Sequence, residues 1–235
     1  MTGLPTSGAD SRGSGRSWKI MVVDDHELAR AGVISLLAGQ RDLEIAAEAA
    51  TGREAITRAA LVKPDLVLMD IRMPEMDGLE ATRRIKEAQP ATSVVILTMH
   101  EDPDYLLAAV QAGAAGYLLK GSSKSEIVGG IRRVLGGESL LDPGLMARLV
   151  QRIAGEPKAA GPIAGSLSAR ELEVLGCIVE GKTNGEIAGA LAITRATVKS
   201  HVERIISKLG VSDRTQAAVR AVQLGLNAAE PGPAS

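Results

Sequence analysis

Residues 64–80 read PDLVLMDIRMPEMDGLE, and this stretch decides the fold. Its apolar run, LVLM, is too short for a free helix and ends at Asp70, before Pro74 and Gly78 interrupt the chain. A continuous apolar run of this length is typical of a central strand in a parallel sheet, buried on both faces. An acid at its end lies at the carboxyl edge of the sheet, where open α/β folds bind ligands. Because Asp is also common where a strand simply becomes a loop, the role of Asp70 depends on the rest of the chain.

The same alternation of a strand and a helix occurs five times between residues 19 and 140. The expected strands cover 20–23, 43–47, 66–70, 93–97 and 115–119. The first expected helix follows the first strand and ends at 37, and the other four cover 53–61, 79–88, 104–112 and 124–135. Such an alternation predicts an α/β fold in which helices cover both faces of a parallel sheet.

Polar side chains follow four of these strands, and parallel strands bring their carboxyl ends to one edge. These side chains are Asp24, Asp25, Asp70, Thr98 and Lys120. Clustered carboxylates raise one another's pKa unless a cation neutralises them. Oxygen ligands suit Mg²⁺, which keeps several waters in an octahedral shell. The sequence therefore predicts a magnesium site at this edge.

Beside such a metal, one carboxylate can attack phosphorus and form an aspartyl phosphate. Phosphoryl transfer needs mainly positioning and neutralisation of the equatorial oxygens, and Lys120 and Thr98 can each stabilise one of them. We expect Asp70 to be the nucleophile, because its strand is central, and Asp24 and Asp25 to be metal ligands.

The composition excludes several classes of protein. The chain has 235 residues, enough for two ordinary domains, and it contains no Phe, one Trp and two Tyr. This scarcity excludes single-strand nucleic-acid binding by stacked aromatic residues. No stretch reaches the roughly 18 apolar residues of a membrane span, the N-terminus lacks the apolar centre of a signal peptide, and the single Cys177 forbids an intramolecular disulfide. We expect a cytoplasmic protein that does not enter membranes.

The C-terminal part has the pattern of a helix-turn-helix. Ser168 and Thr183 each precede a Glu by three residues, as in a capping box that opens a helix. A tight turn then leads to a third helix, 195–208, with one apolar stripe and a polar opposite face. A generic helical bundle is the alternative. Residues 166–228 carry a net charge of +2, against −4 for 19–140, which is compatible with DNA binding but does not prove it.

Four segments resemble the receiver domain of bacterial two-component response regulators: VVDDH at 22–26, MDIRMPEMDG at 69–78, ILTMH at 96–100 and AAGYLLK at 114–120. The resemblance implies a flavodoxin-like, doubly wound (βα)5 receiver phosphorylated at Asp70 by a sensor histidine kinase. It implies the catalytic residues Asp70, Lys120 and Thr98, the switch residues Thr98 and Tyr117, and a Mg²⁺ (or Mn²⁺) site made by Asp25, Asp70, the backbone carbonyl of Arg72 and, partly through water, Asp24. His26 and His100 are interpreted as residues at the edge of the site.

Three further segments resemble the LuxR-type DNA-binding domain: LSARELEVL, GKTNGEIAGALAI and TVKSHVERIISKLGV. With the receiver, they resemble the NarL/FixJ class of response regulators. The resemblance implies that the second domain is all-α, with 215–224 as a dimer contact and the following residues at DNA: Thr194, Lys199, Ser200, Glu203 and Lys208.

The expected division is a disordered tail over 1–18, a receiver over 19–140, a linker with a short helix over 141–165, the LuxR-type helix-turn-helix domain over 166–228 and a disordered tail over 229–235. The expected function is transcription regulation through promoter DNA, by a homodimer that forms on phosphorylation. RNA polymerase is a further expected partner. Whether the regulator activates or represses, and whether its receiver dimerises through the first and fifth helices or the fourth, stays open.

Two rival functions use the same residues. An aspartate-nucleophile phosphohydrolase would also need the acids and Mg²⁺, but such enzymes carry a DxD pattern on the first strand and a substrate cap, which this chain lacks. We therefore expect no substrate turnover, only Mg²⁺-dependent self-phosphorylation and slow self-dephosphorylation at Asp70. The second rival is a receiver that acts only through protein partners.

Overall fold

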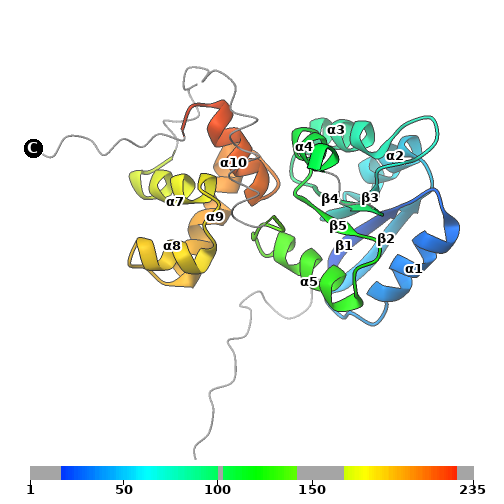
Figure 1. Cartoon of the computed structure of the whole chain (residues 1–235), viewed down its shortest axis with the longest axis horizontal. Coiled ribbons are helices and arrows are strands. Elements are labelled where there is room, and N and C mark those ends of the chain that lie inside the picture. The colour runs from blue at the N-terminus through cyan, green and yellow to red at the C-terminus, as the bar shows by residue number, and fades with distance from the viewer. Residues whose placement is uncertain (1–16, 100–102, 142–166, 227–235) are drawn as a thin grey trace, which may run out of the picture.

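The computed structural model describes residues 17–99, 103–141 and 167–226. These residues form a sheet covered by helices and, after it, a group of four helices (Figure 1). None of the described helices has the length and apolar character that crossing a membrane requires.

The sheet has five parallel strands in the order β2-β1-β3-β4-β5. The strands are β1 (Trp18–Val23), β2 (Leu43–Ala49), β3 (Leu66–Asp70), β4 (Ser93–Thr98) and β5 (Gly116–Leu119). β3 is therefore the central strand, as the apolar run indicates, and all five of its residues are buried. β1 begins at Trp18, inside the expected N-terminal tail 1–18, because the Trp18 amide donates a hydrogen bond to the Asp42 carbonyl at the start of β2.

Helices cover both faces of the sheet. They are α1 (Glu27–Leu37), α2 (Gly52–Val62), α3 (Gly78–Ala88), α4 (Pro103–Gln111) and α5 (Lys124–Leu135). α1 and α5 pack on one face with Ile20, Leu66 and Leu68, whereas α2, α3 and α4 pack on the other with Val67 and Met69. Both faces of β3 are thus in a core, which explains why its sequence is apolar without alternation. The expected (βα)5 architecture is confirmed.

The C-terminal unit consists of α7 (Ala169–Val179), α8 (Asn184–Ala190), α9 (Arg195–Leu209) and α10 (Arg214–Gln223). The capping boxes expected at Ser168 and Thr183 are both present. A buried stripe on α9 packs into the core of this unit, and it consists of Val198, Val202, Ile205 and Leu209. The short α8, the tight turn and the longer α9 have the expected helix-turn-helix order.

The two units touch through α10. The Thr215 hydroxyl donates a hydrogen bond to the Ala115 carbonyl at 2.7 Å, and the side-chain Nε2 of Gln216 donates one to the Ala114 carbonyl at 2.8 Å, just before β5. Leu106 and Val110 of α4 belong to the same buried cluster as the core of the C-terminal unit. In Figure 1, α10 accordingly lies beside α4, between the sheet and the other C-terminal helices.

Some expectations concern residues outside the described ranges. They include the disordered character of 1–16 and 229–235, the linker residues 142–165 with their short helix, and His100.

Candidate phosphoacceptor site and DNA-reading face

The carboxyl ends of the strands bring the predicted residues together. Lys120, directly after β5, places its Nζ atom 2.7 Å from Oδ2 of Asp24 and 2.9 Å from Oδ2 of Asp70. The Lys120 amide also donates a hydrogen bond to the Thr98 carbonyl at 2.7 Å, which ties the end of β4 to this loop. Asp24, Asp70 and Thr98 are all buried, with exposed fractions of 2%, 6% and 8%. Residues from four separate strands therefore form one compact polar site.

Burial and the neighbouring charges shift the pKa values of Asp70 and Lys120 in opposite directions. Burial raises the pKa of Asp70 above its ordinary value, against the opposing contact with the Lys120 ammonium. For Lys120, burial lowers the pKa, but its contacts with the carboxylates of Asp24 and Asp70 outweigh burial, so that its pKa is raised. Lys120 therefore stays charged and is placed to neutralise anionic oxygens bound next to Asp70.

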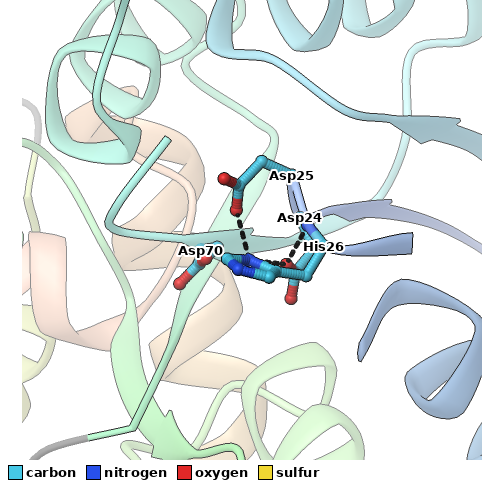
Figure 2. Close-up of side chains that lie close together, drawn as sticks. All are labelled: Asp24, Asp25, His26 and Asp70. Atoms are coloured by element: carbon cyan, nitrogen blue, oxygen red, sulfur yellow. Dashed lines mark hydrogen bonds and ion pairs between the residues drawn. The ribbon is translucent and has the colours of Figure 1, made fainter. Parts of the chain in front are cut away.

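Carboxylate oxygens also gather in a way that fits a cation. Asp24, Asp25, His26 and Asp70 each offer one ligand atom, and these atoms lie within 4.8 Å of one another (Figure 2). Oδ2 of Asp24 is buried and receives no well-directed hydrogen bond, although Lys120 lies close to it as an ion pair. Hard oxygen donors of this kind match Mg²⁺ or Mn²⁺.

His26 is exposed at the edge of the site and contacts both acids. Its Nδ1 atom is 2.8 Å from Oδ1 of Asp25, and its backbone amide donates a hydrogen bond to Oδ1 of Asp24 at 2.9 Å. The sequence shows that His26 directly follows the two acids. Its place as the N-cap residue of α1 comes from the structure.

Gly78 positions the expected phosphoacceptor, Asp70, although the sequence marks this glycine only as a chain break. Its amide donates a hydrogen bond to the Ile71 carbonyl at 2.7 Å. A Cβ atom on Gly78 would lie 1.8 Å from the Asp70 carbonyl oxygen, far inside van der Waals contact. Only glycine lets the start of α3 approach the end of β3 this closely.

Tyr117 lies between the receiver core and the C-terminal unit. It lies on β5 and is partly buried. It packs both against the receiver core on the α2–α4 face and against the cluster that contains the C-terminal helices. Arg72, whose carbonyl is an expected metal ligand, lies two residues after the end of β3 and has an exposed side chain.

The expected DNA-contact residues are spread along α9 instead of gathered at a point. Thr194 caps α9 by accepting a hydrogen bond from the Thr197 amide at 3.1 Å, and Lys199 and Ser200 lie on the first turns. The Lys208 ammonium, in the last turn, lies 2.7 Å from Oε2 of the buried Glu171. This hydrogen bond, with that from the Ser168 amide, lowers the pKa of Glu171 to about 2. Lys208 thus holds the end of α9 against the start of α7.

One side of α9 faces the receiver. Glu203 and Ile206 line a cavity of about 210 Å³ together with Trp18, Asp65 and other receiver residues. In this arrangement part of the expected reading helix lies beside the sheet domain, while the side chain of Glu203 is exposed.

Known protein families match both the receiver part and the C-terminal part of the chain. The family model for the response regulator receiver domain matches residues 20–132, and the model for bacterial regulatory proteins of the luxR family matches 165–221. The response regulator protein VraR of Staphylococcus epidermidis is 42% identical over 208 residues, which cover 88% of this chain and 98% of the relative. VraR of Staphylococcus aureus gives the same identity and coverage.

Two solved structures are also similar. A two-component response regulator of the LuxR family from Aurantimonas matches with a TM-score of 0.53 and 34% identity, over 58% of this chain and 97% of its own. The signal receiver domain of the response regulator NarL from Mycobacterium tuberculosis matches with a TM-score of 0.51 and 33% identity, over 53% of this chain and 100% of its own. The chain belongs to the DNA-binding response regulators of two-component systems, with a receiver domain followed by a LuxR-type helix-turn-helix domain. Proteins of this family are not typical enzymes.

Proposed function

We propose that Asp70 is the phosphoacceptor of this response regulator and that its phosphorylation frees the C-terminal unit to dimerise on promoter DNA. The observation that carries the proposal is the buried Asp70 carboxylate, in contact with Lys120 and beside the carboxylates of Asp24 and Asp25. A carboxylate oxygen of Asp70 forms a bond to phosphorus as the bond to the histidine nitrogen of a sensor kinase breaks and that nitrogen takes the electron pair. Lys120 and the Thr98 hydroxyl hold oxygens of the transferred group.

The cation belongs to the same proposal. Asp25, Asp70 and the Arg72 carbonyl would hold Mg²⁺ or Mn²⁺, with Asp24 acting partly through water. When bound, the metal neutralises charge on the phosphoryl oxygens. Loss of the phosphoryl group to water at the same site gives the slow self-dephosphorylation expected of a switch. No substrate turnover is included in the proposal.

The signal would pass through Thr98 and Tyr117. Thr98 ends β4 beside Asp70, and Tyr117 packs against the cluster shared with the C-terminal unit. A shift of these two residues toward a bound phosphoryl group changes the surface on which α10 rests. The equilibrium between docked and released C-terminal units then depends on how much better the released state accommodates phosphorylated Asp70.

The released unit would read DNA with α9. Its proposed contacts are Thr194, Lys199, Ser200, Glu203 and Lys208, and α10 would supply the contact of the dimer. The proposed domain limits are 19–140 for the receiver and 166–228 for the DNA-binding domain, and the family matches to 20–132 and 165–221 support them. Promoter DNA, a sensor histidine kinase and a second copy of the chain are the proposed partners, and contact with RNA polymerase stays a prediction.

The test measures DNA binding by the full chain on promoter fragments from its own genome, with and without acetyl phosphate and Mg²⁺. We expect the phosphodonor to tighten binding to particular fragments at least tenfold, and Asp70→Asn to show no response while binding weakly. Equal binding by both proteins, with or without the donor, would contradict the role of Asp70. Salt-dependent binding in either case would still distinguish a DNA-binding regulator from one that acts only through proteins.

A further inference from the structure

A second polar cavity lies where the end of the receiver meets the C-terminal unit. Its volume is about 490 Å³, within the range of pockets that bind small molecules. The receiver contributes the end of α5 and the turn that follows it, and the C-terminal unit contributes the α7–α8 turn and the first residues of α9 and α10. The phosphoacceptor residues take no part in its lining.

The charges that line this cavity are mostly positive. Among the described residues that line it, the cations are Arg133, Lys182, Arg195 and Arg214, against a single carboxylate, Glu138. Glu138 forms a loose ion pair with Arg133, with 3.6 Å between Oε2 and Nε. Lys182 is paired with Glu180, with 2.5 Å between Nζ and Oε2. The excess of positive charge in the cavity therefore comes from Arg195 and Arg214.

Arg214 is buried in the wall of this cavity, with an exposed fraction of 4%. Its guanidinium donates hydrogen bonds to Oδ1 of Asn184 and to the Lys182 carbonyl, and within the described parts of the chain it has no ion pair with a carboxylate. Burial lowers its pKa to about 10, so it remains charged at neutral pH. Glu138 and Glu186 attract this guanidinium only at longer range. A buried cation without a carboxylate in contact is costly, and an anion in the cavity would reduce that cost.

Arg195 is a second uncompensated cation. Among the described residues its side chain has neither an ion pair nor a hydrogen bond, and it is an exposed residue that lines the cavity. Its guanidinium lies over Gly185, where an added Cβ atom would come within 3.0 Å of Nη2. The glycine thus leaves room for a flat guanidinium beside the α7–α8 turn.

We propose that this cavity binds a phosphate-bearing small molecule of nucleotide size, held between Arg133 of the receiver and Arg195 and Arg214 of the C-terminal unit. One guanidinium group can donate two parallel hydrogen bonds to the oxygens of a phosphate, so arginine is well suited to bind such a ligand. A ligand that contacts both units stabilises the arrangement in which α10 rests on the receiver, and it therefore opposes DNA binding. This inference does not depend on phosphorylation of Asp70.

The backbone of DNA offers the same phosphate chemistry, so the experiment must separate the two sources. Arg195 and Lys182 belong to the DNA-binding domain and could serve either ligand. Arg133 belongs to the receiver and contributes only to a ligand held between the units. Arg133 is therefore the residue that distinguishes them.

The experiment is an isothermal titration, measured by calorimetry, of pyrophosphate and, separately, of ATP into the full chain without Mg²⁺. We expect saturable binding that weakens at least fivefold in Arg133→Gln and in Arg195→Gln. We expect Glu138→Gln to tighten binding about fivefold, because it removes the one carboxylate that the described part of the chain places in the lining. Arg83→Gln, an exposed arginine on α3 outside the cavity, is the matched control and should bind as the parent does.

A duplex arm completes the test. ATP should weaken DNA binding by the parent chain and have a smaller effect on Arg133→Gln. The proposal is overturned if no saturable binding occurs, or if Arg195→Gln weakens binding while Arg133→Gln does not, which would assign the anion to the DNA-binding surface alone. Loss of binding in Lys120→Gln would place the anion at Asp70 instead and would also overturn it. Asp70→Asn should keep the binding, so failure here and failure of the phosphoacceptor role are separate results.

Discussion

The receiver and the C-terminal unit arrange their proposed functional residues differently. The receiver has them at the carboxyl edge of its sheet, around the proposed phosphoacceptor Asp70, and the C-terminal unit has them along the proposed reading face of α9. At the edge, residues from separate strands are buried and contact one another, as Lys120 does with Asp24 and Asp70. Along α9, the expected contact residues are exposed or partly exposed and are spread from the N-cap to the last turn. A site for chemistry has to be assembled by the tertiary structure, whereas a recognition surface needs a helix held at the correct angle. Substitutions should therefore have larger effects at the edge than on the reading face.

The largest effect is expected for Gly78→Ala. The new Cβ atom would lie 1.8 Å from the Asp70 carbonyl oxygen, so either the end of β3 or the start of α3 must move. We expect a loss of about 3 kcal/mol in the free energy of unfolding of the receiver, typical of severe overpacking, with loss of phosphorylation by acetyl phosphate. Urea denaturation and a phosphorylation assay measure the two effects.

The matched control is Gly129→Ala in α5, where an added Cβ atom meets nothing within 4 Å. Because alanine is the better helix former, this variant should be more stable by about 0.5–1 kcal/mol. Equal destabilisation by both substitutions would show that the receiver is sensitive to any change at a helical glycine, and the special role of Gly78 would be wrong.

A smaller effect is expected where the reading helix is anchored. Glu171→Gln keeps the capping geometry but removes the ion pair with Lys208, and we expect a loss of about 2 kcal/mol at pH 7. The pKa of Glu171 is lowered from 4.5 to about 2, so its contribution is fully present above pH 4.5 and is lost as the pH falls toward 2. Denaturation at several pH values should show the two proteins converging below pH 4.

Glu186→Gln tests whether the stability lost in Glu171→Gln comes from the ion pair with Lys208. Glu186 has the same place in the capping box of α8, but it forms no ion pair within the described residues and is exposed. It should cost clearly less than Glu171→Gln. If the two losses were equal, the capping box would explain the effect and the ion pair would contribute nothing.

Thr215→Val tests the contact between the two halves. It removes the hydrogen bond to the Ala115 carbonyl while keeping the shape of the side chain, at a cost of about 1 kcal/mol to the docked state. Binding of the unphosphorylated chain to DNA should become about fivefold tighter in an equilibrium titration. Thr57→Val, which removes a local hydroxyl bond on α2, should leave DNA binding unchanged. If Thr215→Val bound DNA like the parent, α10 docking would not limit DNA access.

The smallest effect is expected on the reading face. Lys199→Gln should reduce by about one the slope of log affinity against log salt, because one phosphate contact is lost. Binding titrations at several salt concentrations measure that slope. Lys63→Gln, in the receiver just after α2, is the control and should keep the parent slope. An unchanged slope in Lys199→Gln would remove this lysine from the proposed DNA contacts.

Most of the fold could be predicted from the sequence. The apolar run before Asp70 indicates a strand buried on both faces, and capping boxes at Ser168 and Thr183 mark the starts of two helices. Both signals are local: they depend on neighbouring residues and on the periods of strands and helices. The start of β1 at Trp18 was missed because it depends on a hydrogen bond to Asp42, which no local pattern reveals.

The sequence by itself determined the order of the strands and helices and the polar residues that end the strands. Parallel strands necessarily bring such residues to one edge, so the gathering of Asp24, Asp70 and Lys120 could be predicted. Only the tertiary structure decided that Gly78 touches the Asp70 carbonyl, that Lys208 is paired with Glu171 and that α10 rests beside β5. These contacts join residues whose separation depends on how whole elements pack, and periodicity along the chain carries no information about that distance.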